Sequence, residues 1–210
     1  TGEPLALRHY GELVCMTAEM MLEQARLLHM LAQDSRLREE LVLNLIRAES
    51  LSPALGEWAQ RLGIDLSLPR VVAVVEVDSG QLGVDSAMAE LQQLQTLLTS
   101  PERDNLIAIV SLTEMVVLKP ALNNHGRWDA DAHRTRIDNL LARMTERGRL
   151  RIRLALGNYF PGPGGIARSY RTARTTMSVG KQRMPDQRSY FYQDLMLPVL
   201  LDSLRGGWQA

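Results

Sequence analysis

One nearly continuous apolar run constrains the fold of this 210-residue chain more than any other segment. From Arg70 to Asp78 it reads Arg-Val-Val-Ala-Val-Val-Glu-Val-Asp, and most of these residues are valine, which favours strands. A strand with one face in water alternates apolar and polar residues, whereas a strand covered on both faces is apolar almost throughout. The run therefore predicts a strand inside a sheet that is covered on both sides.

A long helix is predicted before this strand. No proline stands between Leu5 and Glu49, and apolar residues recur there at helical spacing. Asp34-Ser35 could restart the helix or lie within it. The pair Ser52-Pro53 should end it, and a short second helix is expected from Pro53 to Leu62, before Gly63.

The segment after the strand shows strand and helix patterns in turn. The predicted elements are a helix over 85–99, a hairpin of 105–111 and 115–119, a helix over 129–148, a strand over 151–157, a helix over 165–181, a short strand over 190–192 and a helix over 195–204. This order predicts an α+β fold, namely a ferredoxin-like core with one additional helix and strand, preceded by long helices.

Charge and cysteine content exclude several classes of protein. Lys and Arg number 24, as do Asp and Glu, so no overall positive field would attract DNA. Cys15 is the single cysteine, so no internal disulfide can form, and we expect a cytoplasmic protein. No apolar run approaches the ~20 residues that cross a bilayer, so no membrane partner is expected. The four histidines lack neighbours at ligand spacing, and we expect no cofactor.

The first part of the long helix carries an apolar repeat with candidates for a dimer or relay helix. These residues are Leu13, Met16, Met20, Leu27 and Leu31. Three of them recur every seven residues, which is typical of helices that pair, so a homo-oligomer is expected. Glu23 and Gln24 interrupt the companion positions, and helix packing within one chain stays open as the alternative.

A predicted turn resembles the signature of a known family. Ser111, Leu112, Thr113, Glu114 and Met115 stand where the diguanylate cyclase (GGDEF) family carries Gly-Gly-Asp/Glu-Glu-Phe, and only Glu114 matches. Two further segments resemble the family: Glu76 to Asp78 is similar to the metal-binding acidic end of its first strand, and Tyr170 to Met177 to the helix before its last strand. The resemblance implies a GGDEF-like palm fold with a degenerate signature turn.

The departures from this family imply that the domain is not an enzyme. A glycine pair would permit positive φ and close approach to a nucleotide, and the acidic residue after it would hold a metal. Where the family carries Phe-Lys-x-x-Asn-Asp, the chain has Ser79 to Val84, and Leu106 to Ile109 replaces the family's Arg-x-x-Asp inhibitory motif. Two-metal chemistry needs converging carboxylates, so we expect no catalytic residue.

Two weaker alternatives remain at this turn. Glu76, Asp78 and Glu114 could form a relic metal site, although an exposed strand end accounts for them equally. The degenerate domain could instead bind a guanine nucleotide as an allosteric ligand, with hydroxyls from Ser111 and Thr113. The side chain of Leu112 would obstruct the backbone approach that glycine allows.

Taken as a whole, the chain resembles the carbohydrate diacid regulator family, also called sugar diacid utilisation regulators. The segments that carry this resemblance are Tyr10 to Glu23, Gly80 to Glu90 and Tyr192 to Asp202. In that family an N-terminal domain senses glucarate, galactarate or glycerate, and a C-terminal helix-turn-helix domain binds DNA in a transcription activator. Thr1 in place of an initiator Met is typical of a fragment, so we expect sugar diacids and DNA to bind only through other parts of the protein.

This resemblance implies four parts along the chain. Residues 1–34 would be the terminal helix of the sugar-diacid recognition domain, and residues 35–66 linker helices. Residues 67–195 would form the degenerate GGDEF-like domain, and residues 196–210 would begin the connection to the helix-turn-helix. The expected role is relay and dimerisation in signalling.

A basic ridge is predicted on the last long helix. Arg168, Arg171 and Arg174 recur every three residues, opposite Ile166 and Met177. A solvated helix face explains such a ridge, and a docking surface for the DNA-binding domain is the alternative.

Overall fold

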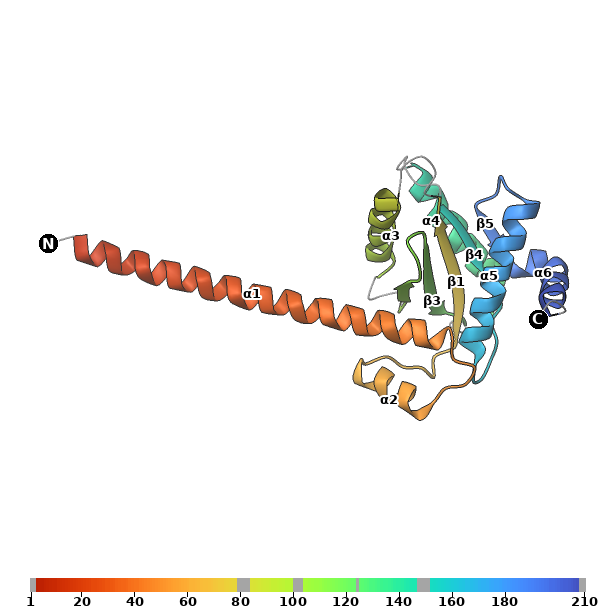
Figure 1. Cartoon of the computed structure of the whole chain (residues 1–210), viewed down its shortest axis with the longest axis horizontal. Coiled ribbons are helices and arrows are strands. Elements are labelled where there is room, and N and C mark those ends of the chain that lie inside the picture. The colour runs from red at the N-terminus through yellow and green to blue at the C-terminus, as the bar shows by residue number, and fades with distance from the viewer. Residues whose placement is uncertain (1–2, 79–83, 100–103, 124, 147–151, 208–210) are drawn as a thin grey trace. The chain divides into compact units, whose positions relative to one another are not determined.

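The computed structural model describes residues 3–78, 84–99, 104–123, 125–146 and 152–207. These residues fall into two compact units, one up to Leu37 and one from Arg38 onward. The elements, labelled in Figure 1, are α1 (Glu3–Leu45), α2 (Pro53–Arg61), β1 (Arg70–Val77), α3 (Val84–Leu98), β2 (Leu106–Ile109), β3 (Glu114–Pro120), α4 (Ala130–Glu146), β4 (Ile152–Leu156), α5 (Gly165–Arg183), β5 (Ser189–Phe191) and α6 (Tyr192–Gly207).

The five strands form one mixed sheet in the order β2-β3-β1-β4-β5. The first four are antiparallel to their neighbours, in the arrangement of a ferredoxin-like fold, and β5 is added parallel to β4. The strands and helices that the sequence predicts are all present, with ends shifted by a few residues. The α+β fold with its additional helix and strand is therefore confirmed.

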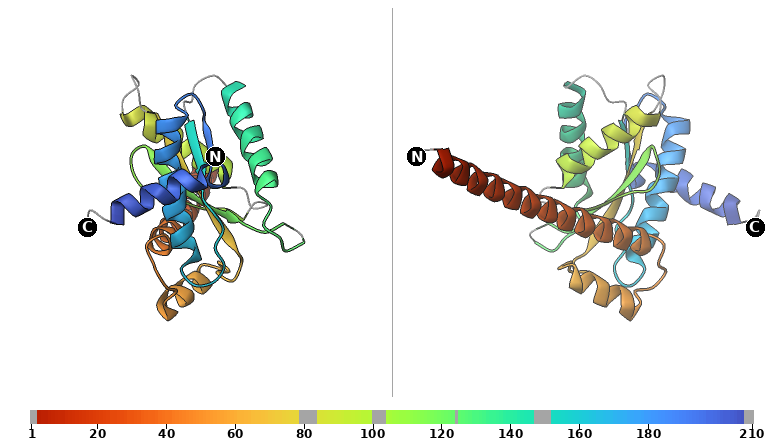
Figure 2. Two further views of the ribbon diagram at one scale, coloured as in Figure 1. Left: turned by 90° about the vertical axis from the view of Figure 1, so that its right-hand side faces the viewer. Right: turned by 60° about the vertical axis from the view of Figure 1, so that its left-hand side comes forward.

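Both faces of the sheet are covered, as the valine run predicts. Val72 and Val74 of β1 pack in a core with α5 and the end of α1, whereas Val71 and Val75 pack in a second core with α3 and α4. Figure 2 shows these helices on the two sides of the sheet. Seven of the eight residues of β1 are buried, and Glu76 alone is half-buried. Glu76 is the one acidic residue of β1, and it lies on the face of the sheet that α5 covers.

The long helix α1 runs without a break past Asp34-Ser35 and ends at Leu45. The expectation that it reaches Ser52-Pro53 was wrong, because from Ile46 the chain turns: Arg47 N–H already bonds to the Asn44 carbonyl three residues back. The short helix α2 does begin after Ser52, whose hydroxyl accepts from the Leu55 N–H at 3.3 Å. Residues of the segment expected as a linker, among them Leu41, Val42 and Leu45, lie in the core of the second unit. The four-part division of the chain stays a prediction.

Two glycines let α5 pack closely. Gly164, which precedes α5, has φ of 71°, so the loop turns into the helix through a conformation that other residues rarely adopt. Gly180 faces the ring of Tyr190 from β5, and a Cβ there would collide with that ring. The sheet-facing side of α5 therefore lies close to the strands that carry the charged residues described next.

Candidate functional site

The turn between β2 and β3 lacks the backbone geometry of a phosphate-binding turn. Val110 N–H bonds to the Glu114 carbonyl at 2.9 Å, which closes a tight hairpin, and the Leu112 side chain is 52% exposed at its tip. Among the described residues other than glycine only Asp104 has a positive φ, so no residue of the turn adopts the conformation that a glycine pair permits. The degenerate turn leaves no backbone cradle for a nucleotide.

The acidic residues near this turn meet at the ends of their strands. Glu76 of β1 stands directly opposite Glu114 of β3 in the sheet register, so two carboxylates lie side by side on the face that α5 covers. Like charges in such a pair repel each other. Asp78 lies 3.9 Å from the guanidinium of Arg153, which pairs with Glu76 on the other side, in β4.

A lysine from α5 compensates the two carboxylates. The Lys181 ammonium donates to both oxygens of Glu76, at 2.9 and 2.7 Å. Glu76 is 22% exposed and Lys181 38%, so this ion pair is partly shielded from water. The positive charge of Lys181 thus offsets the repulsion between Glu76 and Glu114, a role that a bound cation could otherwise fill. Among the described residues no three His, Cys, Asp or Glu side chains are arranged to hold a metal ion.

Two tyrosines complete the cluster. Tyr170 of α5 donates its hydroxyl hydrogen to Glu114 at 3.4 Å. Burial, and then the charge of Glu114, raise the pKa of Tyr170, so this hydroxyl keeps its proton. Burial also raises the pKa of Tyr190, whose hydroxyl donates to the Gln187 carbonyl at 2.8 Å. The contacts of Lys181 with Glu76 and of Tyr170 with Glu114 both join α5 to the sheet, so this arrangement can order α5 on the sheet.

The sequence predicted Glu76 and Glu114 as neighbours but missed Lys181, Tyr170 and Arg153. A signal for Lys181 was present, because it follows Tyr170, Ala173 and Met177 at helical spacing on the side of α5 that faces the sheet. A lysine in line with an apolar stripe indicates a carboxylate on the opposing strand. Residues 79–83, which replace the nucleotide-contacting segment of the cyclase family, lie outside the described residues.

The predicted arginine ridge is exposed on α5. Arg168 lies over the Phe160 ring at 5.2 Å and donates to the Pro161 carbonyl at 3.2 Å. Arg171 is 4.0 Å from Glu49, and Arg174 lies over the Tyr170 ring. Each arginine thus has a local contact. The role of the ridge as a docking surface stays a prediction.

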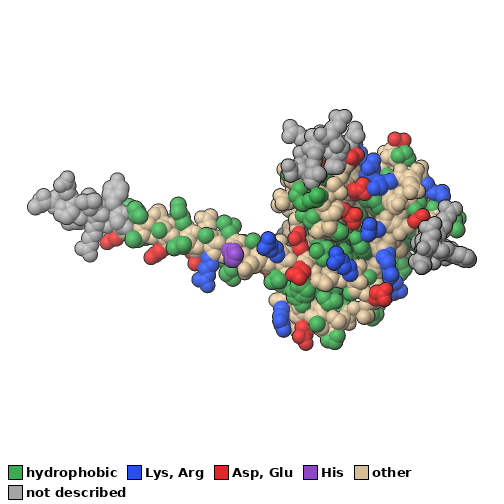
Figure 3. Space-filling view, in the orientation of Figure 1, with side chains coloured by type: hydrophobic (Ala, Val, Ile, Leu, Met, Phe, Trp, Pro, Cys, Tyr) green, Lys and Arg blue, Asp and Glu red, His purple; other side chains and the backbone are tan. Residues whose placement is uncertain are grey.

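The residues predicted for a dimer or relay helix are all exposed. The exposed fractions are 58% for Leu13, 63% for Met16, 67% for Met20, 52% for Leu27 and 67% for Leu31. Figure 3 shows the apolar side chains along the N-terminal helix in green. Cys15 on the same helix is exposed as well. A contiguous exposed apolar surface of this kind is typical of a site that contacts another protein surface. None of the described helices has the length and apolarity to cross a bilayer.

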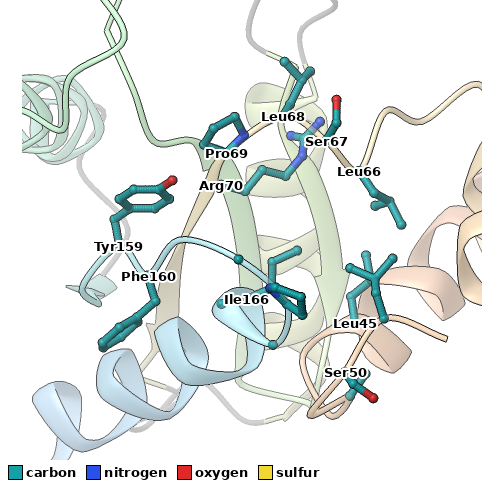
Figure 4. A pocket seen from close by; sticks show the side chains of 16 residues that line it. Leu45, Ser50, Leu66, Ser67, Leu68, Pro69, Arg70, Tyr159, Phe160 and Ile166 are labelled. Atoms are coloured by element: carbon teal, nitrogen blue, oxygen red, sulfur yellow. The ribbon is translucent and has the colours of Figure 1, made fainter.

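A pocket of about 280 Å³ lies at the start of β1. Figure 4 shows its walls, with Leu45 from the end of α1, Leu66 from the segment before β1 and Ile166 from the start of α5. Arg70 lies at its edge with 1% of its side chain exposed, and its guanidinium is held by Asp104 at 2.9 Å. The lining is mostly apolar and the arginine is already paired, so this pocket offers packing surface and no chemistry.

A buried histidine, His133, belongs to α4, which covers the face of the sheet opposite α5. The His133 ring stacks on Trp128 with 4.8 Å between centroids, and Nε2 is 2.8 Å from the Ala121 carbonyl oxygen. A carbonyl can only accept, so Nε2 carries the hydrogen and the buried Nδ1, which has no partner among the described residues, is the bare nitrogen. Burial, aided by Lys119 and Arg136, lowers the pKa of His133 to about 4. The ring is therefore neutral at pH 7.

Comparison with known proteins places these features in a family. A family model described as GGDEF-like domain matches residues 47–179, and one described as "Putative sugar diacid recognition" matches residues 1–45. Over all 210 residues the chain is 79% identical to the carbohydrate diacid regulator of Escherichia coli (strain K12) and 29% identical to an uncharacterized protein of Haemophilus influenzae. It covers 54% of each relative, and so spans about half their length.

A shorter similarity links the chain to a third protein. Over 76 residues, 36% of this chain and 21% of the relative, it is 30% identical to the uncharacterized protein YsfB of Bacillus subtilis. The first of the family models covers well over half of the chain and includes every strand of the sheet up to β4. The chain therefore belongs to the GGDEF-like domain family.

Proposed function

We propose that this chain is the relay and dimerisation part of a sugar-diacid-responsive transcriptional activator in the cytoplasm, and that it acts without catalysis. The similarity to a carbohydrate diacid regulator over the whole chain supports the regulatory role. In this account sugar diacids such as glucarate, and DNA, bind through other parts of the regulator. The observation that carries the relay role is the exposed apolar surface of α1, on a helix that also supplies core residues to the GGDEF-like domain.

The cluster around Glu76 supports the absence of catalysis. Phosphoryl transfer on this fold needs carboxylates that are open to a metal and a turn that admits phosphate. Here Glu76 is paired with Lys181, and the turn carries Leu112. The same two features stand against a guanine nucleotide as an allosteric ligand, and no described residue favours it.

The surface of α1 is suited to a second copy of the chain. At 100° per residue, the five predicted dimer residues fall within about 60° of the helix circumference, which is the width of a coiled-coil seam. Val14, Met21 and Leu28 form a second exposed apolar stripe next to it. One helix can thus contact another copy through the first stripe and the remainder of a sensor domain through the second.

A helix shared in this way can transmit a signal. The backbone of α1 is helical from Glu3 to Leu45, and Leu41, Val42 and Leu45 at its end are buried against the sheet and α5. A packed core resists continuous deformation, so a shift or rotation of α1 would be passed to the domain as a change between discrete arrangements. Sensor closure would in this way alter how two copies present their DNA-binding parts.

Charges placed in the first stripe should separate the two copies. We expect the 210-residue chain to sediment as a dimer and the triple variant Leu13→Lys, Met20→Lys, Leu27→Lys as a monomer, with a Kd raised at least about 100-fold, because each lysine loses apolar contact and repels its counterpart. Sedimentation equilibrium measures both. The variant Ala18→Lys, Ala25→Lys, Ala32→Lys adds the same three lysines at exposed positions on the side of the helix away from the first stripe, and it should stay dimeric. A monomeric wild-type chain, or a dimeric triple variant, would contradict the pairing.

A further inference from the structure

The largest cavity among those described lies on the face of the sheet that α3 and α4 cover. It has a volume of about 530 Å³, within the range of small-molecule sites. Its floor is formed by side chains of three adjacent strands, Ala73 of β1, Val117 of β3 and Leu154 of β4. Glu76 faces the other side of the sheet, so this cavity is separate from the cluster beside α5.

The cavity has a simple origin in the sequence of β1. On this face β1 presents Val71, Ala73, Val75 and Val77. Ala73 stands directly opposite Val117, and its methyl group leaves space that valine fills elsewhere along the strand. Leu98 at the end of α3, with Ile137 and Leu140 of α4, walls this space, so an apolar hollow opens toward solvent between the two helices.

The rim of the cavity is positively charged. Lys119 of β3 and Arg136 of α4 line it, and none of the described lining residues is acidic. Two carboxamides near them are held in place: Asn105 donates to the Leu98 carbonyl at 3.1 Å, and the Asn123 oxygen accepts from the N–H groups of His125 and Arg127 at 3.0 Å. An apolar floor with a few fixed polar groups at one edge is the common form of a small-ligand site.

The two cations of this rim also act on the buried side chain of His133. Burial is the main reason that the pKa of His133 is low, and Lys119 and Arg136 lower it further. Two effects oppose this shift: the hydrogen bond to the Ala121 carbonyl and the charge of Asp129 both raise the pKa of His133. Lys119 and Arg136 line the same cavity and are both near enough to His133 to act on its charge, so an anion bound beside them should also act on it.

We propose that this cavity binds a small organic anion, with its carboxylate or phosphate group between Lys119 and Arg136 and its apolar body on Ala73, Val117 and Leu154. The domain would then respond to this ligand in addition to the signal that arrives through α1. The ligand site lies on the face of the sheet opposite the Glu76 cluster. It does not depend on the relay role of α1, since all its residues belong to the unit from Arg38 onward.

Titration with four probes tests the two halves of this ligand. Phenyl phosphate and phenylacetate carry an anion and a ring, benzyl alcohol only the ring and inorganic phosphate only the anion. Calorimetry and ¹H–¹⁵N NMR on the whole chain should show saturable binding of at least one ring-bearing anion, about tenfold or more tighter than benzyl alcohol or phosphate. Which of the two binds more tightly tells carboxylate from phosphate. The pKa of His133, followed by its ring signals, should rise in the complex.

Substitutions on the floor and rim separate this site from surface binding. Lys119→Met and Arg136→Gln should each weaken binding roughly tenfold, and Ala73→Val should weaken it by filling the floor without a change of charge. Arg127→Gln, an exposed arginine outside the cavity, should bind as the wild-type chain does. Circular dichroism confirms that each variant is folded. No saturable binding, phosphate binding as tightly as phenyl phosphate, or full affinity in both Ala73→Val and Lys119→Met would overturn the proposal.

Discussion

Replacing Lys181 with methionine is expected to lower the free energy of unfolding by about 2 kcal/mol. The substitution keeps the length of the side chain but removes the ammonium that donates to both oxygens of Glu76. That carboxylate is left beside Glu114, with Arg153 on the neighbouring strand as the remaining cation. Removal of one member of a fully buried ion pair costs about 3–5 kcal/mol, and the 38% exposure of Lys181 reduces this figure. Urea denaturation at pH 7 measures the change.

Substitution of the partner residue, Glu76, distinguishes loss of this ion pair from a general loss of packing. Glu76→Gln should cost less than about 1 kcal/mol, because it removes the repulsion from Glu114 and lets Lys181 reach water. In the double variant Glu76→Gln, Lys181→Met most of the stability lost in Lys181→Met should return. Arg183→Met, an exposed residue on the same helix, should change stability by no more than about 0.5 kcal/mol. Equal small losses in both single variants would show that the pair does not hold α5 on the sheet.

Lowering the pH from 7 to 4 is expected to cost roughly 3 kcal/mol of stability through His133 alone. Its pKa is about 4 in the folded chain and 6.5 when exposed, so the unfolded chain takes up the proton first. The contribution of the neutral His133 to stability is therefore present above the unfolded pKa of 6.5 and decreases as the pH falls toward 4. Well below pH 4 both states are protonated, and this group causes no further change. Burial is the main cause, since protonation would place a charge beside Trp128, Lys119 and Arg136.

Other groups also titrate in this range, so the test is a comparison of two proteins. His133→Gln cannot take up a proton but can still donate to the Ala121 carbonyl. It should be less stable at pH 7, yet its stability should fall much less between pH 6.5 and 4 than that of the wild-type chain. Parallel pH profiles for the two proteins would mean that His133 is not kept neutral by the fold.

The fold could be predicted from the sequence because its signals are local. The valine run of β1 gave a strand covered on both faces, and helix and strand periods along the chain gave the order of the remaining elements. The end of α1 was misplaced because Ile46 to Ser50 carries no proline or glycine, so no residue of this segment signals that the helix stops before it.

The candidate site could be predicted only in part, since its members come from distant segments. Glu76 and Glu114 were expected together because both strands were identified beforehand. Lys181 lies 105 residues from Glu76, and no spacing rule joins them before the helix is placed on the sheet. The cavity over Ala73 is harder still to foresee, because an alanine within a valine strand becomes a hollow only when Val117 and α4 are in position.

In the proposed mechanism two copies of the chain meet through α1, and sensing of the diacid changes this contact. The most direct test is a spin-label distance in a regulator that contains this chain and the rest of the length seen in its relatives, with Met20→Cys labelled in a Cys15→Ser background. Paired helices lie 8–10 Å apart, so with the labels we predict an intermolecular distance of roughly 20 Å that shifts by a few ångströms when glucarate is added. No intermolecular distance, or the same distribution with and without glucarate, would contradict the account.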